Sequence, residues 1–410
     1  MVANSGLCSR TQGFDVKSSS VRKVVERVAE VLDMAEFMRG EWILGRRVAT
    51  LLVGVAISAG AQSDNDRGPK QEPPDPTFSQ RPVPKAQSAL TREGKIRLDV
   101  MVSDASGKPV IGLEPWEFRL FDNGQPRKLI SFQRFDGARG KTGPPVEVVL
   151  VMDMLNLTFQ QVAYVRTQVD AFLRQNGGQL KQPTSVMLLT DVGLRVQPRP
   201  STDGNAIAGV VDGIKEHVSS INPAMGGEGW VERFQRSARA MDNIAQNEIK
   251  KPGRKLVIWI GPGWPMLNRP SDGYTERQQR RNFDAIVELS TALREARITV
   301  YSVSQMGASG ANPILYQRFL NPVRTYRDAE MGNLGLKVLV TQTGGRIMGP
   351  DNDVVSQINR CTEDANAFYR ISFDPPAAEH AGEYHDIRVT VDRPDTAVRT
   401  TTGYYDEQLN

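Results

Sequence analysis

Residues 146–152 read VEVVLVM, and only one of these seven side chains is polar. A continuous apolar run of this length is typical of a strand that is covered on both faces, as in a parallel sheet. Three later runs have the same character: SVMLL at 185–189, KLVIWI at 255–260 and ITVYSV at 298–303. We therefore expect these four segments to form the central strands of one sheet.

Segments with helical periodicity separate these strands. The clearest is 159–173, where apolar residues recur at three- and four-residue intervals and so share one face: Val162, Val165, Val169 and Phe172. Similar faces occur in 231–245 and 286–296. Strands that alternate with helices at this spacing predict an α/β domain with a doubly wound, mostly parallel sheet over residues 144–367.

Both flanks of this domain have the pattern of half-buried strands. Residues 95–143 alternate apolar and polar positions, and Asn123-Gly124 is a strong hairpin signal. Residues 368–410 contain three further short runs of alternating character. Because neither set alone would make a stable pair of sheets, we expect them to join into one small β-sandwich, with the α/β domain inserted in it or flanked by it.

The N-terminal region has the composition of a targeting segment. Arg46-Arg47, an apolar run over 48–59 and a small-residue cleavage site at 59–61 predict a signal peptide over 38–61. Residues 1–37 are then a mis-annotated or disordered extension, and the Pro-rich stretch 62–94 is a disordered linker. These features predict an exported protein, periplasmic or extracellular, with no membrane span after cleavage; a retained anchor is the alternative.

Composition and charge exclude several classes of function. The net charge is +4, and the basic residues are regularly answered by acids, so we expect no binding to nucleic acid. No nucleophile elbow, P-loop or zinc-protease motif is present, so we expect no enzyme activity. Cys361 is expected to face the core, while the acidic pair at 363–364 and three scattered histidines (His217, His380 and His385) are expected at the surface.

A family resemblance adds to this interpretation. The order of elements resembles the von Willebrand factor type A fold, and more closely the acidobacterial group of proteins related to that domain. The stretches that carry the match are IRLDVMVSDASGKPVIGLEPWEFRLFDNGQPRKLISF, VVLVMDMLN, GRKLVIWIGPGWP, TGGR, NAFYRISFDPP, GEYHDIRVTV and GYYD. The resemblance covers nearly all of residues 95–406, and it is the order of these segments that makes it specific.

The expected binding site lies where the parallel strands end. In open α/β sheets, ligands bind outside the carboxyl ends of the strands. The residues expected at this rim are Asp153, Asn156 and Thr158 after the first strand, Thr202 and Asp203 before a short helix, and Gly261 and Trp264 after the third. Asp153 and Asn156 could instead only brace the loop or cap the next helix. Trp264 is either an exposed interface anchor or a ring folded back onto the domain.

The resemblance also implies a metal site, which this sequence keeps only in part. Family members that bind Mg²⁺ use Asp-x-Ser-x-Ser in the first loop, a Thr from a second loop and an Asp after the central strand. Asp153 and Thr202 match this pattern, whereas Leu155 and Leu157 replace the serines and Gly261 replaces the later aspartate. We therefore expect a degenerate site and no cofactor, with Mg²⁺ on Asp153 and Thr202 as the alternative.

These features together favour a binding function. We expect an exported scaffold that recognises another protein, not identified by the sequence, through the loop rim. A Mg²⁺-dependent adhesion domain is the first alternative. A hydrolase of envelope or extracellular polymers is the second, and only the signs of export support it.

Overall fold

The computed structural model describes residues 95–136, 146–197, 199–213, 226–265, 274–304, 315–349 and 351–406. The expected extension, signal peptide and linker lie outside these ranges, as does His217. Within the described ranges, no helix is both long and apolar enough to cross a membrane.

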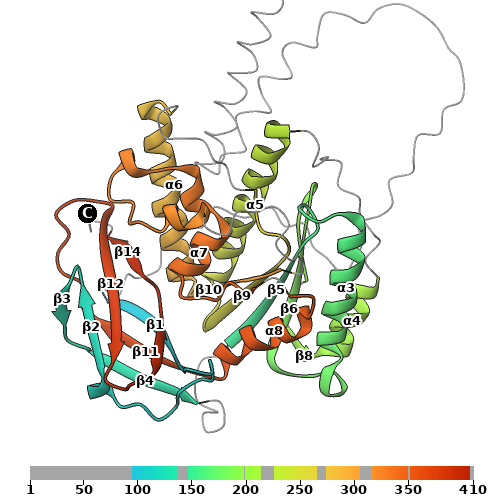
Figure 1. Ribbon diagram of the computed structural model, residues 1–410, viewed down its shortest axis with the longest axis horizontal. Helices are drawn as coiled ribbons and strands as arrows, with labels where there is room; N and C mark the ends of the chain where they lie inside the picture. The colour runs from blue at the N-terminus through green and yellow to red at the C-terminus, as the bar shows by residue number, and fades with distance from the viewer. Residues whose placement is uncertain are drawn as a thin grey trace, which may run out of the picture. The chain divides into compact units, whose positions relative to one another are not determined.

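A six-stranded mixed sheet contains the four apolar runs of the sequence (Figure 1). Its parallel strands are β5 (Val146–Asp153), β6 (Gln179–Thr190), β9 (Arg254–Ile260) and β10 (Ile298–Val303), in the order β10-β9-β5-β6. Two short strands, β7 (Gly193–Val196) and β8 (Ser201–Asp203), pair with β6 in the antiparallel sense. Every residue of β5 and β9 is buried, because helices cover both faces.

The helices divide between the two faces of this sheet. Three of them contribute side chains to one large apolar core with β5, β6 and β9: α3 (Phe159–Leu173), α4 (Gly204–Asp212) and α8 (Val354–Thr362). On the opposite side lie α5 (Gly226–Glu248), α6 (Glu276–Glu295) and α7 (Leu336–Gln342) (Figure 1). Short 3₁₀ turns complete the connections at Gln175–Gly178, Leu315–Phe319, Tyr326–Asp328, Met331–Leu334 and Glu363–Ala365.

Two four-stranded antiparallel sheets form a β-sandwich. One has the order β13-β1-β11-β4, and the other has the order β14-β12-β2-β3. Their strands are β1 (Ile96–Asp104), β2 (Phe118–Asp122), β3 (Gln125–Arg127), β4 (Ser131–Asp136), β11 (Ala367–Phe373), β12 (Glu383–Val391), β13 (Thr396–Arg399) and β14 (Gly403–Asp406), with a 3₁₀ turn at Pro115–Glu117. β1 lies inside its sheet, since Ile96–Val100 pair with β11 and Met101–Asp104 pair with β13.

The fold class expected from the sequence is wrong. Among the described residues, eight strand pairings are antiparallel and three are parallel. The protein is therefore a mixed α/β structure with three sheets, and a doubly wound, mostly parallel sheet does not describe it. The four apolar runs do pair in parallel, but the antiparallel pairings of β7, β8 and the two sandwich sheets outnumber them. Half-exposed antiparallel strands lack continuous apolar runs, so such runs reveal only the parallel part of the fold.

Two further expectations about charged residues are also wrong. Asp364 is buried beside β10 and β13, where it accepts hydrogen bonds from Tyr301 (2.9 Å), Arg346 (3.0 Å) and Arg399 (2.7 Å). His385 is buried in the sandwich, with Nδ1 2.9 Å from Oδ1 of Asp122. Burial of such groups requires hydrogen-bonding partners, which here come from segments distant in sequence. The expected core position of Cys361 is confirmed.

Candidate functional site

Asp153 is the centre of the predicted rim and is fully buried. It ends β5, and both of its carboxylate oxygens accept hydrogen bonds. Oδ1 accepts from the backbone N–H of Asn156 (3.1 Å), and Oδ2 accepts from Nε1 of Trp259 on β9 (2.8 Å). The Asn156 side chain adds two contacts through Nδ2, at 3.0 Å to Oδ1 and 2.9 Å to Oδ2. Asp153 therefore holds together the end of β5, the loop that follows and the neighbouring strand.

Burial also changes the acidity of this carboxyl group. Desolvation raises the pKa of Asp153 to about 6, although hydrogen bonds from Trp259 and Asn156 and the positive charge of Arg233 oppose the shift. Arg233 is itself buried on α5, and loss of water lowers the pKa of its guanidinium. When this carboxyl group is ionised, its charge is therefore stabilised mainly by neutral N–H donors.

Asn156 extends this network to the other face of the sheet. Its Nδ2 also donates to Oγ of Ser237, which lies on α5 (3.0 Å). The loop that contains Asn156 leads directly into α3. The Asn156 amide group therefore connects the loop ahead of α3 with helix α5. Oδ1 of the same amide is buried and has no hydrogen-bond partner among the described residues.

Gly261 and Trp264 complete the packing around Asp153. A Cβ atom on Gly261 would lie 2.8 Å from Cβ of Asp153, so the absence of a side chain allows the loop after β9 to approach. Trp264 is only 5% exposed and packs edge-on against Trp259 (5.2 Å between ring centroids) and Phe234 (6.1 Å). Trp264 is therefore folded back onto the protein and is not the exposed anchor that its loop position allowed.

The remaining first-loop residues have structural roles. Thr158 caps α3, since its Oγ1 accepts from Gln161 N and its backbone N–H donates to the Gln161 side chain. Such a capping box satisfies two N–H groups at the start of a helix. Leu155 and Leu157, which stand where hydroxyl groups would be needed for a metal, are buried.

Thr202 and Asp203 do not belong to the rim. Asp153 is in register with Leu189 of β6, whereas Ser201 pairs with Thr184 and Asp203 pairs with Gln179, near the opposite end of the same strand. β8 therefore pairs with β6 at Thr184 and Gln179, both well before Leu189, which is the residue level with Asp153. Asp203 instead caps α4 by accepting from Ala206 N (3.0 Å).

The residues present do not fit the implied magnesium site. Mg²⁺ requires hard oxygen ligands at close range in near-octahedral geometry. Both oxygens of Asp153 already accept N–H donors, and Thr202 lies at a different level of the sheet. Within the described ranges, no group of three or more His, Cys, Asp or Glu side chains is placed to hold a metal ion.

Three exposed apolar side chains at the rim were missed by the sequence analysis. Phe159 (48% exposed) begins α3, Val192 (61%) lies in the turn between β6 and β7, and Trp230 (49%) lies in the first turns of α5. We refer to Phe159, Val192 and Trp230 as the rim patch. Trp230 precedes the apolar run of α5, and Val192 stands in a short polar turn, so neither gave a periodic signal.

Hydrogen bonds made by neighbouring residues place these side chains around one end of the sheet. Trp230 lies seven residues before Ser237, close to the same helical face and about 10 Å further along the axis. Arg236 on α5 donates to the carbonyl of Asp191, the residue before Val192. Phe159 follows the loop that contacts Ser237 through Asn156. α5 therefore connects to the segments that carry both other members of the patch.

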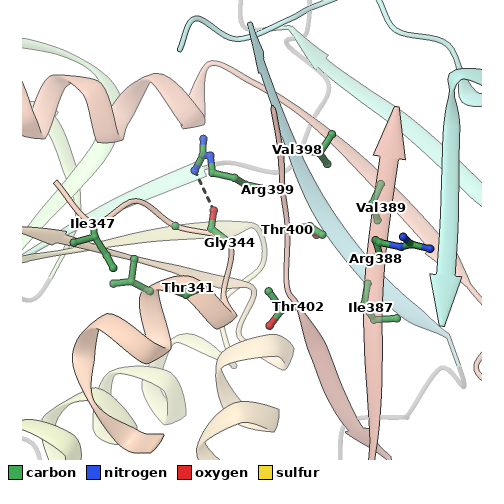
Figure 2. Close-up of a pocket in the computed structure, with 12 residues that line it drawn as sticks. Thr341, Gly344, Ile347, Ile387, Arg388, Val389, Val398, Arg399, Thr400 and Thr402 are labelled. Atoms are coloured by element: carbon green, nitrogen blue, oxygen red, sulfur yellow. Dashed lines mark hydrogen bonds between the residues drawn. The ribbon is translucent and has the colours of Figure 1, made fainter. Parts of the chain in front are cut away.

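A hollow lies between the turn after α7 and strands β12 and β13, away from the rim (Figure 2). Its volume is about 370 Å³, within the range of small-molecule pockets. Two of its polar residues are used inside the protein: Arg399 donates to Gly344 O (3.0 Å) and to Asp364, and Thr400 donates to Asp99 O (3.0 Å). The guanidinium of Arg388 lies over the ring of Phe121. We therefore locate the candidate site at the rim.

Comparisons with known proteins do not assign a family. No family model and no curated protein matches the sequence. Similar solved structures include human COPII-coat protein Sec24c (9% identity, 66% of this chain and 44% of that chain, TM-score 0.30). They also include the pilus adhesin SpaC from Lactobacillus rhamnosus GG in its open conformation (10% identity, 75% and 47%, TM-score 0.33). This chain spans less than half of either, and likeness at these TM-scores supports no functional argument.

Proposed function

We propose that this chain is an exported protein that binds another protein through the rim patch. The observation that carries the proposal is the exposure of Phe159, Val192 and Trp230 at one end of the six-stranded sheet. Large apolar side chains are usually buried, so three exposed ones at the same end of the sheet are candidates for an interaction surface. Export is proposed from the charged, apolar and small-residue pattern over 38–61.

The chemistry of the patch suits a protein partner. Tryptophan is enriched among the residues that dominate interface energies, because one side chain buries a large area at a small entropic penalty. Trp230 projects from a helix whose inner face, including Phe234 and Ser237, is fully buried. A ring on a packed helix is already ordered before binding, which reduces the entropy lost on association.

Site-specific cross-linking tests this proposal. A photoreactive phenylalanine at position 192 should capture one partner protein in cells that make this chain, and the same group at position 130 on the sandwich should not. Ile130 is a suitable control because its side chain is also apolar and exposed. Equal cross-linking from both positions would contradict a binding role for the rim.

The captured partner then allows a matched pair of substitutions. Trp230→Ala should weaken binding about 30-fold, equivalent to about 2 kcal/mol, which is the range of an interface hot spot. Trp116→Ala removes a ring that is 75% exposed on the sandwich and should leave the affinity unchanged. Isothermal titration calorimetry with the purified partner measures both. Equal losses in the two variants would mean that partner binding does not depend on the rim patch.

A further inference from the structure

The rim patch is built from elements on opposite faces of the sheet. Phe159 belongs to α3, which packs with α4 and α8, whereas Trp230 belongs to α5 on the other side. At the end of β5, Asp153 contacts the loop ahead of α3 through the side chain of Asn156. The hydrogen bond from Nδ2 of Asn156 to Oγ of Ser237 then reaches from this loop to α5.

We propose that Asn156 and Ser237 are positioning residues that couple α3 to α5, so that Phe159 and Trp230 form one surface. This inference rests on the proposed function, because it concerns the geometry of the same patch. Ser237 is fully buried, so its hydroxyl group meets the amide in a site without bulk water. Hydrogen bonds in such surroundings are directional, and breaking one leaves a buried polar group without a partner.

Asp153 fixes the orientation of the Asn156 amide. A carboxylate accepts hydrogen bonds and has none to donate, so the amide must present Nδ2 to it. The same nitrogen then points to Oγ of Ser237. The buried Oδ1 without a partner is the consequence of this orientation, since Nδ2 faces both Asp153 and Ser237.

Fluorine NMR on the whole chain tests the coupling without any partner. The sequence has five tryptophans, and 6-fluorotryptophan gives each of them its own resonance. Asn156→Ala lies on the loop ahead of α3, yet it should shift or broaden the Trp230 resonance. Ser237→Ala should do the same from α5. The Trp116 resonance reports the sandwich and should stay in place in both variants.

The double variant decides whether the two residues act through each other. If they do, Asn156→Ala combined with Ser237→Ala should move the Trp230 resonance no further than the larger single change. Ser237→Thr keeps the hydroxyl group and should restore the original resonance. The proposal would be overturned if the Trp230 shifts of the two single variants added up in the double variant. It would also be overturned if Asn156→Ala left the Trp230 resonance unchanged. Movement of the Trp116 resonance would reveal a general loss of folding. In that case, the comparison of Ser237→Ala with Ser237→Thr tests the proposed coupling by itself.

Failure of this inference differs from failure of the proposed function. If Trp230→Ala abolishes partner binding while the NMR shifts are additive, the rim binds a partner but the coupling through Asn156 is wrong. If the shifts are non-additive and no partner is captured at position 192, the coupling holds and the proposed function is wrong.

Discussion

The indole nitrogen of Trp259 donates to Oδ2 of Asp153 at 2.8 Å, which joins the last residue of β5 to the adjacent strand β9. Both side chains are completely buried. An ionised carboxylate in such a place must be compensated by hydrogen bonds or charges. Here the compensation comes mostly from neutral N–H groups, with Arg233 as the nearby positive charge.

We expect Asp153→Asn to remove a dependence of stability on pH. The pKa of Asp153 is raised from 3.8 to about 6, chiefly by desolvation, so folding favours the protonated acid. The stability from this group is fully present below pH 4 and is lost as the pH rises through 6. A shift of this size corresponds to about 3 kcal/mol. Urea unfolding at pH 4, 5, 6 and 7 should show the loss in the natural protein and not in the variant.

Glu288 affects the same experiment and must be compared between the two proteins. Its pKa is raised to about 7 by desolvation and by the charges of Asp242 and Asp284, so it changes stability in the same direction. Because Glu288 is present in both proteins, the difference between their curves isolates Asp153. Parallel curves would show that the carboxyl group is not destabilised by burial.

We expect Gly261→Ala to destabilise the protein by about 1–3 kcal/mol, the usual effect of overpacking a core. The added methyl group would lie 2.8 Å from Cβ of Asp153, with Gly261 and Asp153 both buried. Gly209→Ala is the matched control, because that glycine lies in α4 with open space around it. Alanine in a helix is favoured over glycine by about 1 kcal/mol, so the control should gain stability. Thermal and urea unfolding measure both, and equal effects would contradict the close approach at Asp153.

We expect Mg²⁺ and Mn²⁺ to leave the melting temperature of the natural protein unchanged relative to a chelator. An ion that binds only the folded state at a hundredfold excess over its Kd adds about 2.7 kcal/mol of stability. Both oxygens of Asp153 already accept N–H donors, so a metal would have to displace them. A clear upward shift that disappears in Asp153→Ala would instead restore metal-dependent adhesion as the function.

Local elements were largely predictable, because periodicity and caps act over a few residues. The helix expected over 159–173 is confirmed as α3, and each of the four apolar runs is confirmed within a strand of the six-stranded sheet. The fold class was wrong because the direction and number of strand pairings depend on contacts between distant segments. Asp364 was misplaced for the same reason, since its arginine partners are not its neighbours in sequence.

The candidate site was predictable only around its first loop. Asp153, Asn156 and Gly261 do meet, because each follows a parallel strand that ends at the same edge. Thr202 was misplaced because a short antiparallel strand carries it along β6, and sequence order does not say how far. Trp230 was missed because it precedes the apolar run of α5, and apolar periodicity identifies buried faces and not single exposed side chains.

The interior position of β1 has a mechanical consequence. This strand is the first that the structure describes, and ladders of hydrogen bonds hold it on both sides, to β11 along its first half and to β13 along its second. A force that pulls on the chain ahead of Lys95 acts along β1 and shears many of these bonds at once. Because these bonds are loaded together and not one after another, β1 resists such a force better than a strand that is peeled away bond by bond.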